Sequence, residues 1–242
     1  MLLPNEIQVW LHIPTGPSTA RKQPSLLARR LLQAALADQG VSVPDGFIET
    51  PALDLFDSIR DAAGLETSIA HCPGLISVAL SRRRVGIDCE RPRSGRNWPE
   101  IASSFFTAGE NALLTDAPVE LREGMFLRFW TLKEAMIKAN RGNLWTDINR
   151  LVFEPSGIVA REPEGIVDDW VTWQGDYAGA TIGVCSAAGR DARFEFRDCR
   201  QLSEDNLSSA TNRAVFPEGG KVEIALALRS RDSNTSIGNR ER

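Results

Sequence analysis

The segment Arg84–Glu90, with the sequence Arg-Val-Gly-Ile-Asp-Cys-Glu, limits the fold more than any other part of the chain. Its alternation predicts a strand with one apolar face and a second face that carries Asp88 and Glu90. Two carboxylates at neighbouring positions of one face repel each other unless a cation lies between them, and a hard divalent metal ion is such a cation. On spacing alone a second interpretation stays open, in which the strand runs out into solvent and Glu90 begins a loop.

The composition is that of a folded, mildly acidic protein. The 242 residues carry a net charge of −4, with 42% hydrophobic and 25% charged residues, which is ordinary for one large or two small globular domains. The negative charge argues against a nucleic-acid partner, because phosphates are bound through an excess of basic residues. We expect the densest basic cluster to attract an anionic ligand or an acidic partner, although a solvated basic loop has the same composition. This cluster comprises Arg82, Arg83, Arg84, Arg91, Arg93 and Arg96.

The cysteine and histidine content excludes several kinds of site. Four cysteines show neither paired zinc spacing nor the density of a disulfide framework, so a reducing compartment is expected. Because His12 and His71 are the only histidines, a centre built from several histidines is excluded. The N-terminus lacks a signal-peptide pattern and no apolar run is long enough for a membrane span, so we expect a cytoplasmic protein without a membrane partner.

Residues 1–96 are predicted to form an α/β half. A helix is predicted over residues 25–39, where Arg29 and Arg30 lie either in solvent or close to a phosphate. Residues 46–64 have no clear period and are predicted to be a connection. The predicted strands cover residues 7–13, 67–70, 75–80 and 84–90.

Residues 97–190 are predicted to form a second α/β half. Pro99 suits the first turn of a helix, and Thr107 with Glu110 matches a capping box at the start of the next one. A longer helix is predicted over residues 123–139. The predicted strands cover residues 148–153, 158–161, 170–174 and 178–186, with a turn at 154–157.

The remaining residues are predicted to be an addition to these halves. Residues 191–228 form a C-terminal extension with one strand over 221–228. Residues 229–242 are polar and charged, and we expect a mobile tail there.

The long helix contains a second group of candidate site residues. Glu134 and Lys138 are four residues apart, a spacing that is most often a mildly stabilising surface pair. Asp88 and Glu90 lie roughly forty residues upstream. If both segments contribute to one cation site, Glu134 and Lys138 belong to that site and are not a surface pair.

Together the two segments resemble the signature of the 4′-phosphopantetheinyl transferase superfamily, Gly-Ile-Asp-x-Glu followed by Trp-x-x-Lys-Glu-Ala. The matching segments are Gly86–Glu90 and Trp130–Ala135, with Phe105–Glu110 between them. Over residues 7–188 the length and layout resemble the larger, surfactin-synthetase-type members. The resemblance implies an α+β fold, a pseudo-dimer of two similar α/β halves in which each half is a small sheet packed with a long helix, and a monomeric protein.

The family activity that the resemblance implies is transfer of 4′-phosphopantetheine from coenzyme A to a serine of an apo acyl or peptidyl carrier protein. A serine hydroxyl attacks the β-phosphate and 3′,5′-ADP is released. Asp88, Glu90 and Glu134 are implied as ligands of Mg²⁺, which prefers carboxylates together with phosphate oxygens and water. Glu134 would also help to deprotonate the serine, and Lys138 would assist the leaving group.

Further residues are implied as contacts of the coenzyme. His71 would hydrogen-bond one of its phosphates, with a buried structural histidine as the alternative. Lys133 would balance phosphate charge, and Arg29 and Arg30 would bind the coenzyme as well. The chain departs from the family pattern beside the histidine, where Ala70 and Cys72 replace hydroxyl residues, and these departures concern the coenzyme more than the metal.

Two other functions stay open. Metal-dependent nucleases also combine acids with a lysine, but they place the second acid and the lysine two residues apart on a strand, whereas Glu134 and Lys138 are four apart on a predicted helix. A non-catalytic module that binds coenzyme A or a carrier protein is compatible with Ala70 and Cys72, whereas the complete set of acids and lysines argues against it.

Overall fold

The computed structural model describes residues 1–14, 23–154, 157–160 and 170–199. Its strands are β1 (Glu6–His12), β2 (Glu66–Cys72), β3 (Leu75–Ser81), β4 (Val85–Glu90), β5 (Leu151–Glu154), β6 (Gly157–Ala160), β7 (Val171–Tyr177), β8 (Ala180–Ser186) and β9 (Arg193–Asp198). Its helices are α1 (Gln23–Asp38), α2 (Ala52–Ala63), α3 (Trp98–Phe105), α4 (Ala108–Asp116), α5 (Val119–Ala139) and α6 (Leu144–Asp147), with a 3₁₀ turn at Ile148–Arg150. The strand predicted over 221–228 and the tail predicted over 229–242 lie outside the described residues.

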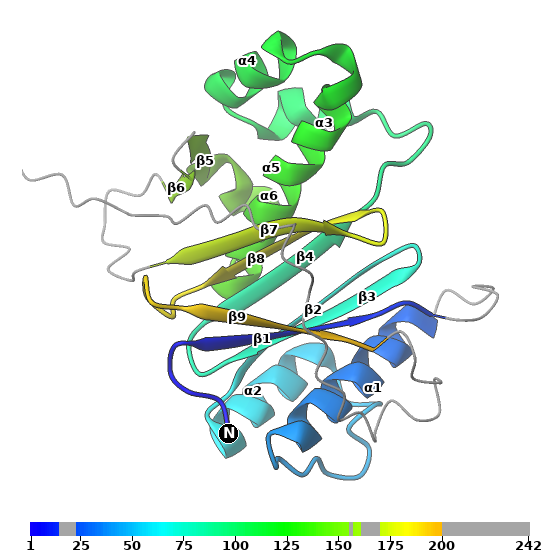
Figure 1. Ribbon diagram of the computed structural model, residues 1–242, viewed down its shortest axis with the longest axis vertical. Coiled ribbons are helices and arrows are strands. Elements are labelled where there is room, and N and C mark those ends of the chain that lie inside the picture. The colour runs from blue at the N-terminus through cyan, green and yellow to red at the C-terminus, as the bar shows by residue number, and fades with distance from the viewer. Residues whose placement is uncertain (15–22, 155–156, 161–169, 200–242) are drawn as a thin grey trace, which may run out of the picture.

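Two main sheets pack against each other, with helices on the outer face of each (Figure 1). The first sheet has the order β2-β3-β1-β9, the second has the order β4-β8-β7, and β5 with β6 forms a separate ribbon. β9 pairs with β1 in parallel, whereas the other pairs are antiparallel. The chain is therefore a mixed α/β protein, as predicted.

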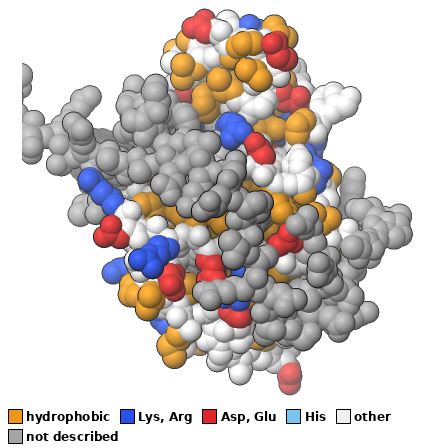
Figure 2. All heavy atoms as spheres, in the orientation of Figure 1, with side chains coloured by type: hydrophobic (Ala, Val, Ile, Leu, Met, Phe, Trp, Pro, Cys, Tyr) orange, Lys and Arg blue, Asp and Glu red, His pale blue; other side chains and the backbone are white. Residues whose placement is uncertain are grey.

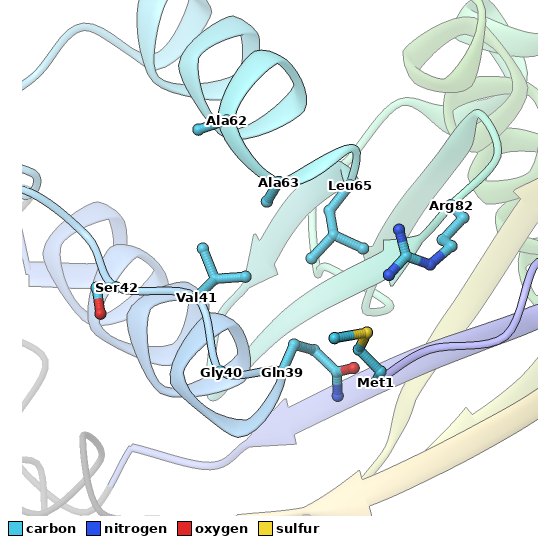
Figure 3. A pocket seen from close by; sticks show the side chains of 9 residues that line it. All are labelled: Met1, Gln39, Gly40, Val41, Ser42, Ala62, Ala63, Leu65 and Arg82. Atoms are coloured by element: carbon cyan, nitrogen blue, oxygen red, sulfur yellow. The ribbon is translucent and has the colours of Figure 1, made fainter.

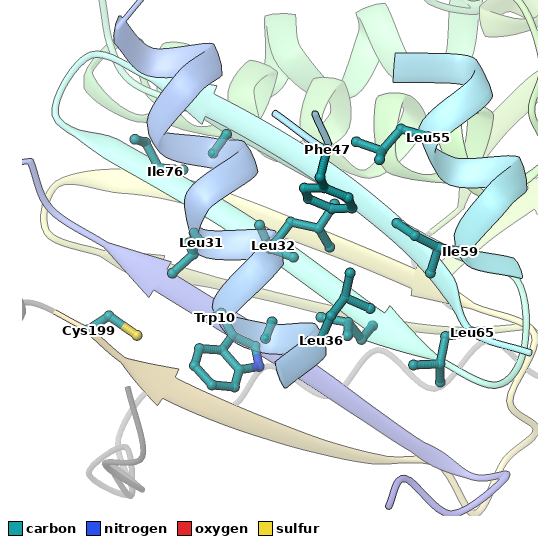
Figure 4. Close-up of a cluster of buried hydrophobic side chains, with 14 of the residues drawn as sticks. Trp10, Leu31, Leu32, Leu36, Phe47, Leu55, Ile59, Leu65, Ile76 and Cys199 are labelled. Carbon is teal, nitrogen blue, oxygen red and sulfur yellow. The ribbon is translucent and has the colours of Figure 1, made fainter. Parts of the chain in front are cut away.

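Each outer face is covered by its own helices. α1 and α2 lie on the first sheet, where they bury the cluster drawn in Figure 4, which includes Trp10, Leu31 and Ile59. α5 lies on β4 and β8 of the second sheet, and its other sides pack against α3 and α4 through aromatic residues such as Phe126 and Trp130. A third cluster fills the space between the two sheets.

The pairing of strands crosses the predicted boundary at residue 96. β4 precedes that boundary but pairs with β8, so the first half supplies an edge strand to the second sheet. β9 belongs to the predicted extension and pairs with β1 in the first sheet. The division into residues 1–96 and 97–190 stays a prediction, and strand pairing interlocks the two parts.

Four elements were not predicted: α2, α6, β9 and the 3₁₀ turn at Ile148–Arg150, which occupies the start of a predicted strand. Residues 46–64 were expected to be a connection, but α2 occupies most of them because Leu55 and Ile59, four residues apart, are both buried against the first sheet. Gly64 ends this helix in the left-handed conformation. β9 lacks a clear alternation, since most of its side chains are only partly buried.

Close packing of α5 on the second sheet depends on two glycines. A Cβ atom on Gly86 of β4 would lie 1.9 Å from the backbone oxygen of Ala135. A Cβ atom on Gly183 of β8 would lie 2.9 Å from the backbone of Thr131. Because Gly183 pairs with Asp88, this close approach brings the helix directly over the acidic face of β4.

Across the part of the chain that the structure describes, no helix combines the length and the apolar character that a membrane crossing requires.

Candidate active site

A pocket of about 350 Å³ opens where the edge strands β2 and β4 meet between α1 and α5. Six of the predicted site residues line it together: Arg29, His71, Asp88, Glu90, Glu134 and Lys138. The other lining residues are Ser25, Ala28, Ile69, Ala70 and Cys89. Residues from four separate elements thus converge in one place, as the resemblance implied for these six.

The acids reach the pocket because of the alternation of β4. Ile87 and Cys89 point into the core between the sheets, so Asp88 turns to the opposite face and meets α5. The strand is held at this edge by a hydrogen bond of 3.1 Å from the backbone N–H of Ile87 to the hydroxyl of Ser68 on β2. The alternation predicted from the sequence is confirmed, and the interpretation of a strand running out into solvent is wrong for Asp88, which is only 6% exposed.

Lys138 joins the acids of both elements. Its Nζ donates to Asp88 Oδ1 at 2.7 Å and to the carbonyl oxygen of Ile87 at 3.2 Å, and it lies 3.9 Å from Glu134 Oε2. The pair of Glu134 and Lys138 is therefore part of the pocket rather than a surface pair along one helix. Asp88 Oδ2 is buried and has no hydrogen-bond partner among the described residues.

Burial and like charge change the acidity of these groups. Burial, followed by the negative charge of Asp88, raises the pKa of Glu134 to about 7. Burial also raises the pKa of Asp88, although Lys138 opposes this change. For Lys138, burial acts to lower the pKa, but the charges of Asp88 and Glu134 outweigh it and raise that pKa. The lysine therefore stays charged, whereas ionisation of Asp88 and Glu134 beside it is disfavoured.

His71 and Arg29 form the opposite wall of the pocket. His71 is exposed on β2, so the alternative of a buried structural histidine is wrong. Arg29 projects from α1 and its Nη1 donates to the carbonyl oxygens of Ile48 and Thr50, which fixes the guanidinium beside the pocket. These basic side chains therefore line the same pocket as the acids.

The structure places Lys133 and Arg30 elsewhere. Lys133 is fully buried on the far side of α5, where its Nζ donates to Glu110 Oε2 at 2.7 Å and lies 4.6 Å from the ring centre of Phe106. Neighbouring residues of a helix point about 100° apart, so Lys133 turns into the core when Glu134 faces the pocket. The implied contact of Lys133 with phosphate is therefore corrected. Arg30 lies on α1 but does not line the pocket.

The basic cluster predicted around β4 is not one surface. Arg82 lies before the strand, where its Nε donates to the carbonyl oxygen of Leu2, whereas Arg96 lies beyond the other end and contacts Glu90. On the face drawn in Figure 2, Lys and Arg side chains are scattered rather than gathered. The arginines of this cluster therefore lie at both ends of β4, and their attraction of an anionic ligand or an acidic partner stays a prediction.

A second pocket of about 330 Å³ lies between the ends of α1 and α2 (Figure 3). Its lining includes Met1, Gln39, Val41, Leu65 and Arg82 but no carboxylate and no histidine. The chemistry of a catalytic site is therefore concentrated in the first pocket.

The carboxylates of the first pocket suit a hard divalent ion. In the described part of the chain no three acidic, histidine or cysteine side chains already stand as a preformed metal cluster, because Lys138 lies between the acids. Two observations nevertheless fit a cation: Asp88 Oδ2 is buried without a hydrogen-bond partner among the described residues, and burial together with the charge of Asp88 raises the pKa of Glu134. Oxygen donors of this kind are those that Mg²⁺ prefers.

The raised pKa of Glu134 predicts a pH-dependent stability. The folded protein retains a proton on this residue between its ordinary pKa of 4.5 and about 7, whereas the unfolded chain releases it. This contribution is present below the lower value and is lost as the pH rises through about 7, with a size on the order of 3 kcal/mol. We expect the melting temperature of the ligand-free protein to fall more steeply across this range than that of Glu134→Gln, as measured by calorimetry. Parallel curves would show that Glu134 titrates normally.

A pocket that combines buried acids, a charged lysine and an accessible histidine suits acid–base chemistry on an anionic substrate. Residues 84–185 match the family model described as "4'-phosphopantetheinyl transferase superfamily". This region of the chain therefore belongs to the 4′-phosphopantetheinyl transferase superfamily, as its two motifs predicted.

Curated relatives agree with this assignment. The chain is 30% identical over 134 residues to the 4'-phosphopantetheinyl transferase AcpT of Salmonella typhimurium, which covers 55% of this chain and 66% of the relative. It is 36% identical over 78 residues to the 4'-phosphopantetheinyl transferase HetI of a Nostoc species, covering 32% of this chain and 33% of that protein. The similarity thus spans just under two thirds of the first relative and a third of the second.

Proposed function

We propose that this protein transfers 4′-phosphopantetheine from coenzyme A to a serine hydroxyl of an apo carrier protein and releases 3′,5′-ADP. One observation carries the proposal: Asp88, Glu134 and Lys138, from a strand and a helix far apart in the sequence, meet in one pocket inside the region that matches the family. The relatives described above are named for the same activity.

We assign Asp88, Glu90 and Glu134 as the residues that hold Mg²⁺. When bound, the ion supplies positive charge that neutralises the pyrophosphate of the coenzyme. The free oxygen of Asp88 and the strained carboxylate of Glu134 support this assignment. Lys138 contacts two of these acids, Asp88 and Glu134, and neutralises them in the ligand-free arrangement.

The same residues provide for the transfer of a proton. A pKa of about 7 makes Glu134 an effective acceptor of the serine proton near neutral pH. The serine oxygen then forms a bond to the β-phosphorus, and the bond from that phosphorus to the oxygen of 3′,5′-ADP breaks. Lys138 retains its proton because of the surrounding acids, and its positive charge stabilises the leaving phosphate.

We assign the basic wall of the pocket to the phosphates of coenzyme A. His71 is exposed there and Arg29 is held in place by two carbonyl oxygens, so both can meet an anion without rearrangement of the backbone. Cys72 is buried, so the hydroxyl that it replaces would have pointed into the core rather than at the ligand. Ala70 lines the pocket, so of the two departures beside His71 only this one bears on the wall.

We also propose that the chain is a monomer of the larger subtype, with a pseudo-dimer of two α/β halves. In support, each sheet carries a long helix on its outer face, α1 on the first and α5 on the second, and the pocket lies between these helices. The four cysteines are free and buried, which suits a reducing compartment such as the cytoplasm.

A second candidate is a module that binds coenzyme A without catalysis. The contact of Lys138 with Asp88 favours it, because the acids are already neutralised without a metal ion. A nuclease is disfavoured because the glutamate and lysine lie on a helix.

Intact-protein mass spectrometry tests the proposal. The purified chain is incubated with coenzyme A, Mg²⁺ and an apo carrier protein, and we expect the carrier to gain the mass of phosphopantetheine. The same carrier with its serine replaced by alanine, and a reaction with excess chelator, are the controls. Binding of coenzyme A in calorimetry without any mass gain, for acyl and peptidyl carriers alike, would favour the binding module.

A further inference from the structure

Arg96 lies between the two elements that form the acidic side of the pocket. It belongs to the loop that leads from β4 to α3, and its Nη1 is 3.2 Å from Glu90 Oε2. Its guanidinium carbon also lies 5.4 Å from the ring centre of Phe126 and 5.7 Å from that of Trp130. One side chain thus contacts the end of β4 and the face of α5 at the same time.

The aromatic surface below Arg96 is rigid and ordered along the helix. Phe126 and Trp130 are one turn apart on α5 and their rings stack with centres 5.8 Å apart. Trp130 in turn lies one turn before Glu134. A guanidinium resting on these rings therefore sets where Glu90 stands relative to Glu134, since the platform and Glu134 belong to the same helix.

The contact between Arg96 and Glu90 differs from that between Lys138 and Asp88. Lys138 makes a hydrogen bond of 2.7 Å to its acid. Arg96 Nη1 and Glu90 Oε2 are close enough for attraction, but their angles are not those of a hydrogen bond, and both atoms are buried. The arginine therefore orients the carboxylate while leaving its oxygens available to a cation.

We propose that Arg96 is a positioning residue that holds Glu90 in place for the divalent metal ion. The inference rests on the proposed function, because it takes Glu90 as a metal ligand. The burial of Arg96 supports this role: its side chain is only 16% exposed, and it contacts both Glu90 and the aromatic rings.

The affinity for the metal ion distinguishes two possible roles of Arg96. The arginine either positions Glu90 or only repels the metal ion through its own positive charge. Arg96→Met keeps an apolar stem over the rings but loses the charge that orients Glu90. If Arg96 only repelled the metal ion, its removal would tighten metal binding. If it positions Glu90, removal weakens binding, by about tenfold or more as is usual for groups that orient metal ligands.

The experiment measures Mn²⁺ binding to the full chain without coenzyme A, by electron paramagnetic resonance of free Mn²⁺. We expect Arg96→Met to bind about tenfold more weakly than the wild-type protein, and Arg96→Lys to lie between them because it keeps the charge without the planar stack. The matched control is Arg93→Met in the same loop, where the side chain is exposed. It removes the same charge, and we expect unchanged affinity.

A double-mutant cycle with Glu90→Gln completes the test. In that background the Arg96→Met change should have no further effect on Mn²⁺ affinity, because the residue to be positioned is already lost. An equal loss in both backgrounds, or tighter binding in Arg96→Met alone, would overturn the proposal. Wild-type protein that binds no Mn²⁺ would overturn the metal assignment as well, whereas normal binding with a silent Arg96→Met would overturn only the role of Arg96.

Discussion

Glu134→Gln is expected to lower the rate of phosphopantetheine transfer by about a thousandfold or more, within the range that loss of a general base or of a metal ligand produces. The substitution keeps the shape of the side chain but removes its charge and its ability to accept the serine proton. Glu134 lines the pocket together with Asp88 and Lys138 and is not itself a member of the buried apolar cluster around α5. The loss should therefore appear in turnover and not in the content of folded protein.

The measurement is the time course of carrier mass under saturating coenzyme A and Mg²⁺, with circular dichroism of the same samples. Glu120→Gln is the matched control, because this glutamate lies on the first turn of α5, is exposed and does not line the pocket. A folded Glu134→Gln protein with nearly normal turnover would remove Glu134 from the mechanism.

The sequence predicted best those site residues whose placement depends on a single strand or a single helix. Alternation along β4 places Asp88 on one face, and spacing along α5 places Glu134 and Lys138 one turn apart, so each segment could be interpreted alone. Their meeting depends on the contact between α5 and β4, which followed only from the family resemblance. That contact requires Gly86 of the motif, because any side chain at this position would collide with the backbone of α5.

Residues whose role depends on the rotation of a helix could not be assigned in the same way. Lys133 is next to Glu134 in the motif, but it contacts Glu110, which also caps α4 by accepting from the backbone N–H of Thr107 at 2.8 Å. The sequence did predict the capping box of Thr107 and Glu110. It contained no signal that the same carboxylate would pair with a buried lysine, because tertiary partners of a charge have no periodicity.

The predicted boundaries between the halves, and the absence of a prediction for β9, depended on pairing between strands that are far apart in the sequence. The predicted boundaries at residues 96 and 190 are both crossed by strand pairing, because β4 of the first half pairs with β8 and β9 of the predicted extension pairs with β1. Neither pairing is local, and β9 has no regular burial pattern from which it could be predicted. The arginines around β4 show the same dependence on the fold, since residues that are close in sequence lie at opposite ends of the strand that separates them.

Gly86→Ala is the second large effect that the structure predicts. The added methyl group would lie 1.9 Å from the backbone oxygen of Ala135 and 2.7 Å from the backbone nitrogen of Ala139. Backbone atoms within a helix cannot move individually, so α5 as a whole must shift away from β4. We expect destabilisation of about 3 kcal/mol, at the upper end of what overpacking usually causes.

Activity should fall as well, because the same shift separates Glu134 and Lys138 from Asp88. A displacement of about 1 Å is enough to cost on the order of a hundredfold in rate. Thermal melting and the transfer assay, run on the same preparation at a temperature where the variant is folded, measure the two effects separately.

Gly124→Ala provides the matched control, since it makes the same chemical change in α5 itself. Gly124 is exposed and an added Cβ atom would meet nothing within 4 Å. Alanine is favoured over glycine inside a helix by about 1 kcal/mol, so this variant should be more stable than the wild-type protein and equally active. If Gly86→Ala instead melted and reacted like Gly124→Ala, the close contact between α5 and β4 would not exist, and the convergence of the two motifs in one pocket would lose its physical basis.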